Sequence, residues 1–275
     1  MNPFAPASGL ADPHVRVFQG RVFLYTGTDD DPEGRDWVMR RWRIFSSGDL
    51  KNWRSEGEIL PRDTYMGEGS PDCWAGDVAE REGRYYFYFS DRSRGIGVMV
   101  ADRPEGPFRD PVGKPLLEKS HDPTVLVEKD ASRTAWLVSG SKERRGYTLA
   151  RLREDMMGLA EDPKPITIRG REWEEAPSWM DKNYLFCHEG IYYLSWGRDY
   201  AVSDCLAGPY DSVGPVAEGE GLSEYAHGSF FQWKEQWYHI WCRYCRPGYK
   251  FRELVLRPCE VGQGKIKTLV DCPVV

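Results

Sequence analysis

The sequence lacks the features that mark membrane, secreted and nucleic-acid-binding proteins. It contains no apolar run long enough to span a bilayer, and its first residues, MNPFAPASGLADP, have neither the basic start nor the apolar stretch of a secretion signal. The formal net charge is −6 and the basic clusters are short, which argues against a phosphate-backbone partner. We therefore expect a cytoplasmic protein with no membrane or nucleic-acid partner, or a secreted one if a signal peptide precedes the given sequence.

Closely spaced cysteines of the kind that staple small secreted domains are also missing. The chain has 7 Cys, an odd number, and only Cys242 and Cys245 form a C-x-x-C pair. No second pair follows at zinc-finger spacing, so reduced thiols are expected. Aromatic residues, in contrast, are plentiful, with 11 Trp, 15 Tyr and 11 Phe. Aromatic rings fill sheet cores, and their flat faces also suit the apolar faces of sugar rings.

Short apolar or alternating runs recur along the chain and predict β-strands rather than helices. These runs are RVFLYTG, WRIFSS, RYYFYFS, IGVMVA, TVLVE, TAWLVSG, YTLARL, IYYLSWG, YAVSD, SFFQW, QWYHIWC and FRELVL. They fall into five groups, which open near Asp12, Trp74, His121, Glu174 and His227.

The five groups start at intervals of roughly fifty residues, which suits four-stranded propeller blades. We predict an all-β fold, a five-bladed β-propeller with four-stranded antiparallel blades around a central channel, as a single domain over residues 1–275. A sandwich or barrel would also explain the strands, but it would not predict a repeat of this length. In a propeller, residues at the start of each blade converge on one opening of the channel.

Three of the five blade starts carry a carboxylate in a similar setting, Ala11-Asp12-Pro13, His121-Asp122-Pro123 and Glu175-Ala176-Pro177. Proline after an acid opens many turns, and it is expected to hold the acid in extended backbone at the start of a strand. Three such acids in register with the repeat suggest a shared site. Hydrolysis of an acetal requires one acid to protonate the departing oxygen. It also requires a second carboxylate, which either activates a water molecule or attacks the anomeric carbon directly. A third can raise the pKa of the proton donor.

The motifs ADP, WAGDV, HDPTVL, EEAPSW and AHGSFF occur in this order at the five blade starts. With this order and spacing, the chain resembles glycoside hydrolase family 43, whose members are five-bladed propellers acting mainly on arabinose- and xylose-containing polysaccharides. The resemblance implies a glycosidase of the α-L-arabinofuranosidase or β-xylosidase type with an inverting mechanism. Asp12 would be the general base, Asp122 would raise the pKa of the acid and orient it, and Glu175 would be the general acid. The adjacent Glu174 is an alternative donor.

The resemblance also implies further substrate-binding residues. Trp74 would stack on a sugar ring, Asp77 would support the site, and Arg243 would contact the acids. His227 would lie near the channel axis, holding water or a metal ion, so that a calcium ion or other cation near His227 is an expectation. No other cofactor is required, and the partner is an oligo- or polysaccharide.

Two other enzyme classes and one binding class remain alternatives. Fructan- and sucrose-cleaving propellers also use three acids, but their motifs differ from ADPH and HDP here. A propeller phosphorylase would need a basic pocket for inorganic phosphate. A non-catalytic carbohydrate-binding propeller would not require the three acids to converge.

Overall fold

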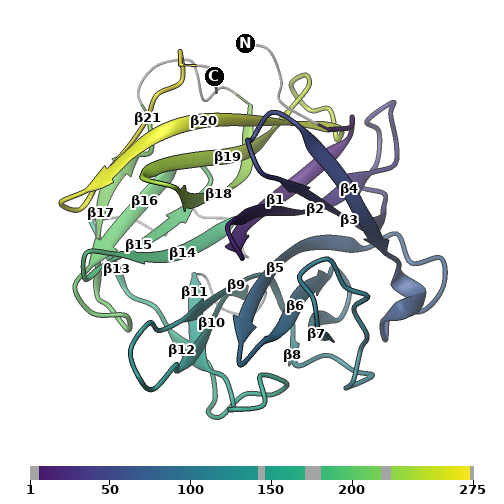
Figure 1. Cartoon of the computed structure of the whole chain (residues 1–275), viewed down its shortest axis with the longest axis horizontal. Helices are drawn as coiled ribbons and strands as arrows, with labels where there is room; N and C mark the ends of the chain where they lie inside the picture. Colours follow the sequence, from purple (N-terminus) through teal and green to yellow (C-terminus); the bar gives the residue numbers. More distant parts are fainter. Residues whose placement is uncertain (1–5, 142–145, 171–180, 218–223, 273–275) are drawn as a thin grey trace.

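The computed structural model describes residues 6–141, 146–170, 181–217 and 224–272, which form five β-sheets around a central channel (Figure 1). The predicted all-β five-bladed propeller is confirmed. Within the described ranges, one short 3-10 turn, η1 (Pro61–Asp63), is the only helical element. No helix in these ranges is long and apolar enough to cross a membrane.

Each blade is an antiparallel meander of four strands in chain order, from the channel outward. The first blade contains β1 (Leu10–Phe18), β2 (Arg21–Asp29), β3 (Met39–Ser47) and β4 (Trp53–Ile59). The second contains β5 (Cys73–Arg81), β6 (Arg84–Asp91), β7 (Gly95–Ala101) and β8 (Leu117–Glu118). The third contains β9 (Ser120–Val127), β10 (Ala135–Ser141), β11 (Tyr147–Arg151) and β12 (Lys164–Pro165).

The last two blades follow the same plan. The fourth contains β14 (Asn183–His188), β15 (Ile191–Trp196), β16 (Asp199–Ser203) and β17 (Tyr210–Pro215), with β13 (Ile168–Arg169) added parallel to β17. The fifth contains β18 (Tyr225–Trp233), β19 (Gln236–Tyr244), β20 (Arg252–Gly262) and β21 (Lys265–Thr268). The inner strands β1, β5, β9, β14 and β18 pack against their neighbours around the ring.

Tight hairpins join the inner strand to the second strand in most blades. The turns Gln19-Gly20, Glu82-Gly83 and Glu189-Gly190 have positive φ at both residues, between 51° and 77°. This backbone matches the right-handed twist of paired strands, and glycine adopts it at little cost. The residue before each glycine is long and polar, and the turn exposes it to solvent. These local signals fix where each inner strand ends.

The start of the inner strand is irregular in the first, second, third and fifth blades. The pairing register shifts between Ala11 and His14 in β1 and between Cys73 and Gly76 in β5, and equivalent shifts occur in the β9–β10 and β18–β19 ladders. Such β-bulges turn side chains out of the regular alternation and are frequent beside active sites. They place the blade-start side chains at the channel opening.

Asp12 and Asp122 adopt left-handed backbone within these bulges, with φ of 50° and 51°. The expectation of extended backbone before proline was therefore wrong for both acids. Residues other than glycine avoid this region, and a strained backbone of this kind persists only where the surrounding structure holds it. The surrounding ladder pairs supply that restraint, and the strain falls on the two acids that sequence motifs single out.

Large aromatic side chains fill the space between neighbouring blades. Trp42, Phe87 and Phe89 are buried and packed edge-on or tilted between the first and second blades. Each such side chain stabilises the fold by about 1.5–3 kcal/mol through removal of apolar surface from water. Most of the aromatic residues that the composition shows therefore serve the core.

The ring closes between the first and fifth blades through side chains, because these blades are separate sheets. The Ser229 hydroxyl donates a hydrogen bond of 2.8 Å to the carbonyl of Pro13. Arg252, the first residue of β20, reaches across to Asp29 at the end of β2, with both carboxylate oxygens accepting from its guanidinium at 2.7 and 2.9 Å. The same junction borders the blade-start acids.

Candidate functional site

The blade starts surround a cavity of about 210 Å³ at one opening of the channel. It is lined by Asp12, Trp37, Met39, Trp74, Asp122, Asp181, Lys182, Tyr244 and Arg252. These residues come from all five blades or from the segments between their strands. The hairpin ends of the inner strands border a second cavity of about 420 Å³, so the channel has a cavity at each end.

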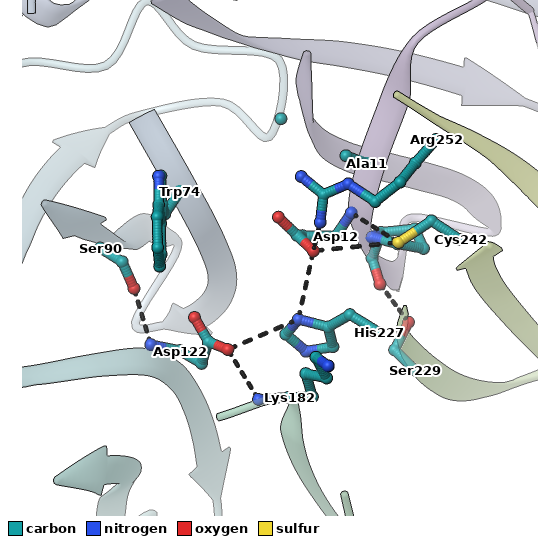
Figure 2. A network of polar contacts seen from close by, with 12 residues as sticks. Ala11, Asp12, Trp74, Ser90, Asp122, Lys182, His227, Ser229, Cys242 and Arg252 are labelled. Carbon is teal, nitrogen blue, oxygen red and sulfur yellow. Dashed lines mark hydrogen bonds and ion pairs between the residues drawn. The ribbon is translucent and has the colours of Figure 1, made fainter. Parts of the chain in front are cut away.

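Asp12 is held by contacts to one of its two carboxylate oxygens. Its Oδ1 accepts a 2.7 Å hydrogen bond from Arg252 and lies 3.5 Å from Nδ1 of His227, while the Cys242 thiol is 3.9 Å away (Figure 2). The backbone amide of Asp12 donates to Sγ of Cys242. The hydrogen bonds and ion pairs that the described residues make to this carboxylate therefore all reach Oδ1. Its Oδ2 is left to interact with whatever occupies the cavity.

The charge state of Asp12 follows from competing effects. Burial alone would raise the pKa of this carboxyl group, because a low-dielectric site penalises the charged form. Arg252, His227 and His14 outweigh that effect and hold the pKa of Asp12 well below its usual range. Asp12 is therefore an ionised carboxylate near neutral pH, which is the state that a general base requires.

Asp122 lies opposite Asp12 and is fixed from both neighbouring blades. Its backbone amide donates to the hydroxyl of Ser90, and its Oδ2 accepts a 2.7 Å hydrogen bond from the backbone amide of Lys182 (Figure 2). The same oxygen is 3.7 Å from Nδ1 of His227. The structure thus places Asp12 and Asp122, which are far apart in the sequence, on either side of one imidazole.

His227 lies beneath the two acids and is 1% exposed. Burial lowers the pKa of this imidazole, but the close carboxylates of Asp12 and Asp122 raise the pKa by more, so the net shift is upward. Its ring also packs edge-on against His14, with the centroids 5.1 Å apart. His227 thereby bridges the two carboxylates rather than lining the cavity.

Arg252, not Arg243, is the arginine that contacts Asp12. Arg243 on β19 forms an ion pair with Glu253, and its side chain is 23% exposed. Arg252 is buried and bridges Asp12 and Asp29. Burial lowers the pKa of its guanidinium, but the two carboxylates raise that pKa well above the usual value, so the charge is retained.

Asp77 lies deeper in the channel and does not line the cavity at the blade starts. It forms a two-point ion pair with Arg16, and its oxygens also accept from the backbone amides of Val78 and Val125, both at 2.8 Å. The expected supporting role is therefore a structural link among the first three blades.

Aromatic side chains form part of the cavity wall. Trp74, which the sequence motif singled out, lines the cavity, and its carbonyl accepts a 2.6 Å hydrogen bond from the indole of Trp42. Trp37 lines the cavity as well, with the guanidinium of Arg252 4.8 Å from its ring centroid. Two indoles and the ring of Tyr244 thus offer apolar faces next to carboxylates, an arrangement that suits sugar rings.

Glu174 and Glu175 lie outside the described residues, so the proposed general acid and its distance from Asp12 stay predictions. A cation near His227 also stays a prediction. Among the residues that the structure describes, no group of three or more His, Cys, Asp or Glu side chains is arranged to hold a metal ion.

Several cavity residues were not found by sequence reasoning. Trp37 and Met39 lie around the start of β3, and Tyr244 ends β19, so they do not occur at blade starts. Arg252 opens the third strand of the fifth blade and has no motif around it. Asp181 and Lys182 directly precede β14 and did carry a signal, because they stand at a blade-start distance from the turn Glu189-Gly190.

The chain is similar to known proteins over most of its length. The sequence model of "Glycosyl hydrolases family 43" matches residues 1–264. A xylosidase/arabinosidase from Bacteroides ovatus is 27% identical over 280 residues, covering 85% of each chain. A β-xylosidase from Xylanibacter ruminicola is 24% identical, covering 96% of this chain and 98% of the relative.

Solved structures extend the likeness to the whole fold. The GH43_1 enzyme from Xanthomonas citri, complexed with xylotriose, superposes with a TM-score of 0.82 at 26% identity, over 100% of this chain and 93% of that one. A β-xylosidase/α-arabinofuranosidase from a compost microbial metagenome superposes with a TM-score of 0.83 at 24% identity, over 98% and 97% of the two chains.

Proposed function

Because the chain belongs to glycosyl hydrolase family 43, we propose that it hydrolyses xylose- or arabinose-containing glycans in the cavity at the blade starts. The observation that supports this most is the asymmetric environment of Asp12. One carboxylate oxygen is held by Arg252, while the other is left toward the cavity. A charged, oriented carboxylate of this kind is suited to remove a proton from water.

The proposed reaction is a single displacement. Asp12 accepts a proton from a water molecule as the water oxygen bonds to the anomeric carbon. A carboxylic acid of the fourth blade protonates the departing oxygen as the glycosidic bond breaks, and the resemblance of the EEAPSW motif to the family implies Glu175 for this role. The product sugar has the inverted anomeric configuration. In inverting enzymes the two carboxyl groups are roughly 6.5–9.5 Å apart, which leaves room for the water.

The other cavity residues support these steps. Asp122 contributes a second negative charge near the donor, which favours its protonated form. His227 holds Asp12 and Asp122 in a fixed relation, with its Nδ1 3.5 and 3.7 Å from them. Trp74 and Trp37 offer stacking surfaces for the sugar. The chemistry requires no cofactor, and a cation near His227 would adjust the charge around these acids.

The names of the relatives support the substrate class. The Bacteroides ovatus relative is a xylosidase/arabinosidase, and a Paenibacillus polymyxa relative, 26% identical over 316 residues, is an arabinoxylan arabinofuranohydrolase. We therefore expect this chain to act on β-xylosyl or α-L-arabinofuranosyl linkages, with an oligo- or polysaccharide as its partner.

The test is release of 4-nitrophenol from the α-L-arabinofuranoside and the β-D-xyloside by the native chain, Asp12→Asn and Glu175→Gln. We expect the native chain to cleave at least one of them and Asp12→Asn to be about 10²–10⁴-fold slower. Asp211→Asn, an exposed carboxylate on β17 paired with Arg169, is the matched control. Failure of the native chain on both glycosides and on arabinoxylan would contradict the proposal. Release only with added phosphate would indicate a phosphorylase.

A further inference from the structure

In the first and second blades the cavity residue lies eight or nine residues before the glycine of the hairpin turn that follows it. Asp12 precedes Gly20 by eight residues, and Trp74 precedes Gly83 by nine. Both residues line the cavity, and both glycines are the second residue of a tight turn with positive φ. In an antiparallel hairpin the turn fixes the register of the strand before it, so this distance determines which residues reach the channel opening.

In the fourth blade this distance selects Asp181 and Lys182, not Glu175. Lys182 precedes Gly190 by eight residues and Asp181 by nine, whereas Glu175 precedes it by fifteen. The backbone agrees, because Lys182 has a φ of 64°, close to the 50° of Asp12. Asp181 therefore occupies the position that Trp74 occupies in the second blade.

Asp181 borders the same cavity as the two blade-start aspartates. Asp181 and Lys182 both line it together with Asp12 and Asp122. The carbonyl of Asp181 accepts a 2.8 Å hydrogen bond from the hydroxyl of Tyr147, and the next amide, that of Lys182, donates to Asp122. The backbone on the carboxyl side of Asp181 is thus fixed from the third blade.

The electrostatic environments of Asp181 and Asp12 differ in the direction that the reaction needs. Burial raises the pKa of Asp181, and although the charge of Lys182 lowers it, Asp122 raises it further, so the net shift is upward. The pKa of Asp12 is shifted downward. Two carboxyl groups whose environments separate their pKa values are the usual pair of proton donor and proton acceptor.

We propose that Asp181, in place of Glu175, is the proton donor of this cavity. This inference rests on the proposed hydrolysis and changes only the residue that serves the leaving group. The Asp181 carboxyl proton passes to the glycosidic oxygen as the bond from that oxygen to the anomeric carbon breaks. The water oxygen bonds to the anomeric carbon and its proton passes to Asp12. Exchange with solvent then returns one proton to Asp181 and removes one from Asp12.

The leaving group tests this assignment, because a good leaving group departs without protonation. We compare kcat/KM on xylobiose, or on an arabinosylated xylo-oligosaccharide, with kcat/KM on the matching 2,4-dinitrophenyl glycoside. Asp181→Asn is expected to lose about 10²–10⁴-fold on the oligosaccharide and less than about tenfold on the dinitrophenyl glycoside. Glu175→Gln is expected to leave the ratio between the two substrates unchanged. Asp211→Asn is the matched control on the same blade.

The opposite pattern would overturn the assignment. If Glu175→Gln changes the ratio between the substrates and Asp181→Asn does not, Glu175 is the donor. Asp12→Asn is expected to lower kcat/KM equally on both substrates, because the general base activates water in the same way for either leaving group. If the native chain cleaves neither substrate, the proposed function is contradicted instead.

A measurement without substrate distinguishes failure of the Asp181 assignment from failure of the proposed hydrolysis. In protein with ¹³C-labelled aspartate carboxyls, the resonance absent from Asp181→Asn is expected to titrate above the usual aspartate range. Titration of that resonance at or below the usual range would overturn the donor role even in a protein with no detectable activity.

Discussion

Two buried aspartates of the channel, Asp12 and Asp77, each pair with an arginine, but within the described part of the chain only Asp12 has a carboxylate oxygen without a polar partner. Asp77 is 0% exposed, and both of its oxygens are engaged by Arg16 and by backbone amides. Asp12 presents Oδ1 to Arg252 and leaves Oδ2 toward the cavity. A fully satisfied carboxylate stabilises a fold, whereas a held but incompletely satisfied one is available for chemistry.

The surroundings of the two aspartates reflect the same difference. Around Asp77 the charge of one arginine balances that of the acid, and the pairing of β5 with β6 is regular from Gly76 onward. Around Asp12 lie further acids and a buried imidazole, and Asp12 itself has left-handed backbone with a φ of 50°. Substitutions at the two positions should therefore affect different properties of the protein.

The largest expected effect is on catalysis, at Asp12. Asp12→Asn keeps the shape of the side chain but removes the base, so kcat should fall about 10²–10⁴-fold. Asp77→Asn should lower kcat only as far as it unfolds the protein. Steady-state kinetics at a temperature where both variants are folded checks this. Equal losses of kcat in the two variants would remove the distinction between the aspartates.

The next effect is on stability, at Asp77. Asp77→Ala leaves the Arg16 charge without its partner in a largely buried site, which should cost about 3–5 kcal/mol in the free energy of unfolding. Urea unfolding followed by tryptophan fluorescence measures this. The matched double variant Asp77→Leu with Arg16→Met removes both charges and should recover most of the loss. A loss below about 1 kcal/mol in Asp77→Ala would show that the ion pair does not hold the blades.

A smaller effect is on the pH dependence, at Arg252. Arg252 lowers the pKa of Asp12, so its removal raises that pKa. Arg252→Gln should therefore move the acid limb of the kcat/KM profile to higher pH by about 1–3 units. An unchanged acid limb would show that another group controls it.

The same arginine links pH to stability. The pKa of Asp12 is depressed in the folded state, so its contribution to stability is present above the unfolded pKa of about 3.9 and is lost as pH falls further. Arg252→Gln should reduce this contribution, which thermal unfolding between acid and neutral pH would measure.

The smallest effect is expected at Arg243. Its ion pair with Glu253 is partly exposed, so Arg243→Gln should change the free energy of unfolding by less than about 1 kcal/mol. Because the guanidinium does not reach the cavity, kcat/KM should stay within about twofold of the native value. A large loss of activity in this variant would restore Arg243 as a substrate contact.

The fold could be predicted from sequence because its signals are local. Alternating strands recur in every blade, and turns such as Glu82-Gly83 fix strand ends in the first, second and fourth blades. The position of Asp12 and Asp122 followed from the repeat, but their left-handed backbone did not, since the general preference before proline is for extended backbone. That preference is overridden by the bulge.

The remaining parts of the site depend on contacts between blades. Arg252 reaches Asp12 from a third strand, and nothing in the segment around it marks this role. In the fourth blade the motif around Glu175 and the hairpin register of Asp181 point to different residues. Sequence motifs identify a family's chemistry, while the ladder register determines which side chain reaches the cavity.

The most direct test of the account is the configuration of the first sugar released. A glycoside that the native chain cleaves is followed by ¹H NMR from the first minutes, before the anomers equilibrate. Activation of water by Asp12 predicts that the opposite anomer to that of the substrate accumulates first. Accumulation of the same anomer would contradict the account, because it would require a carboxylate to attack the sugar directly.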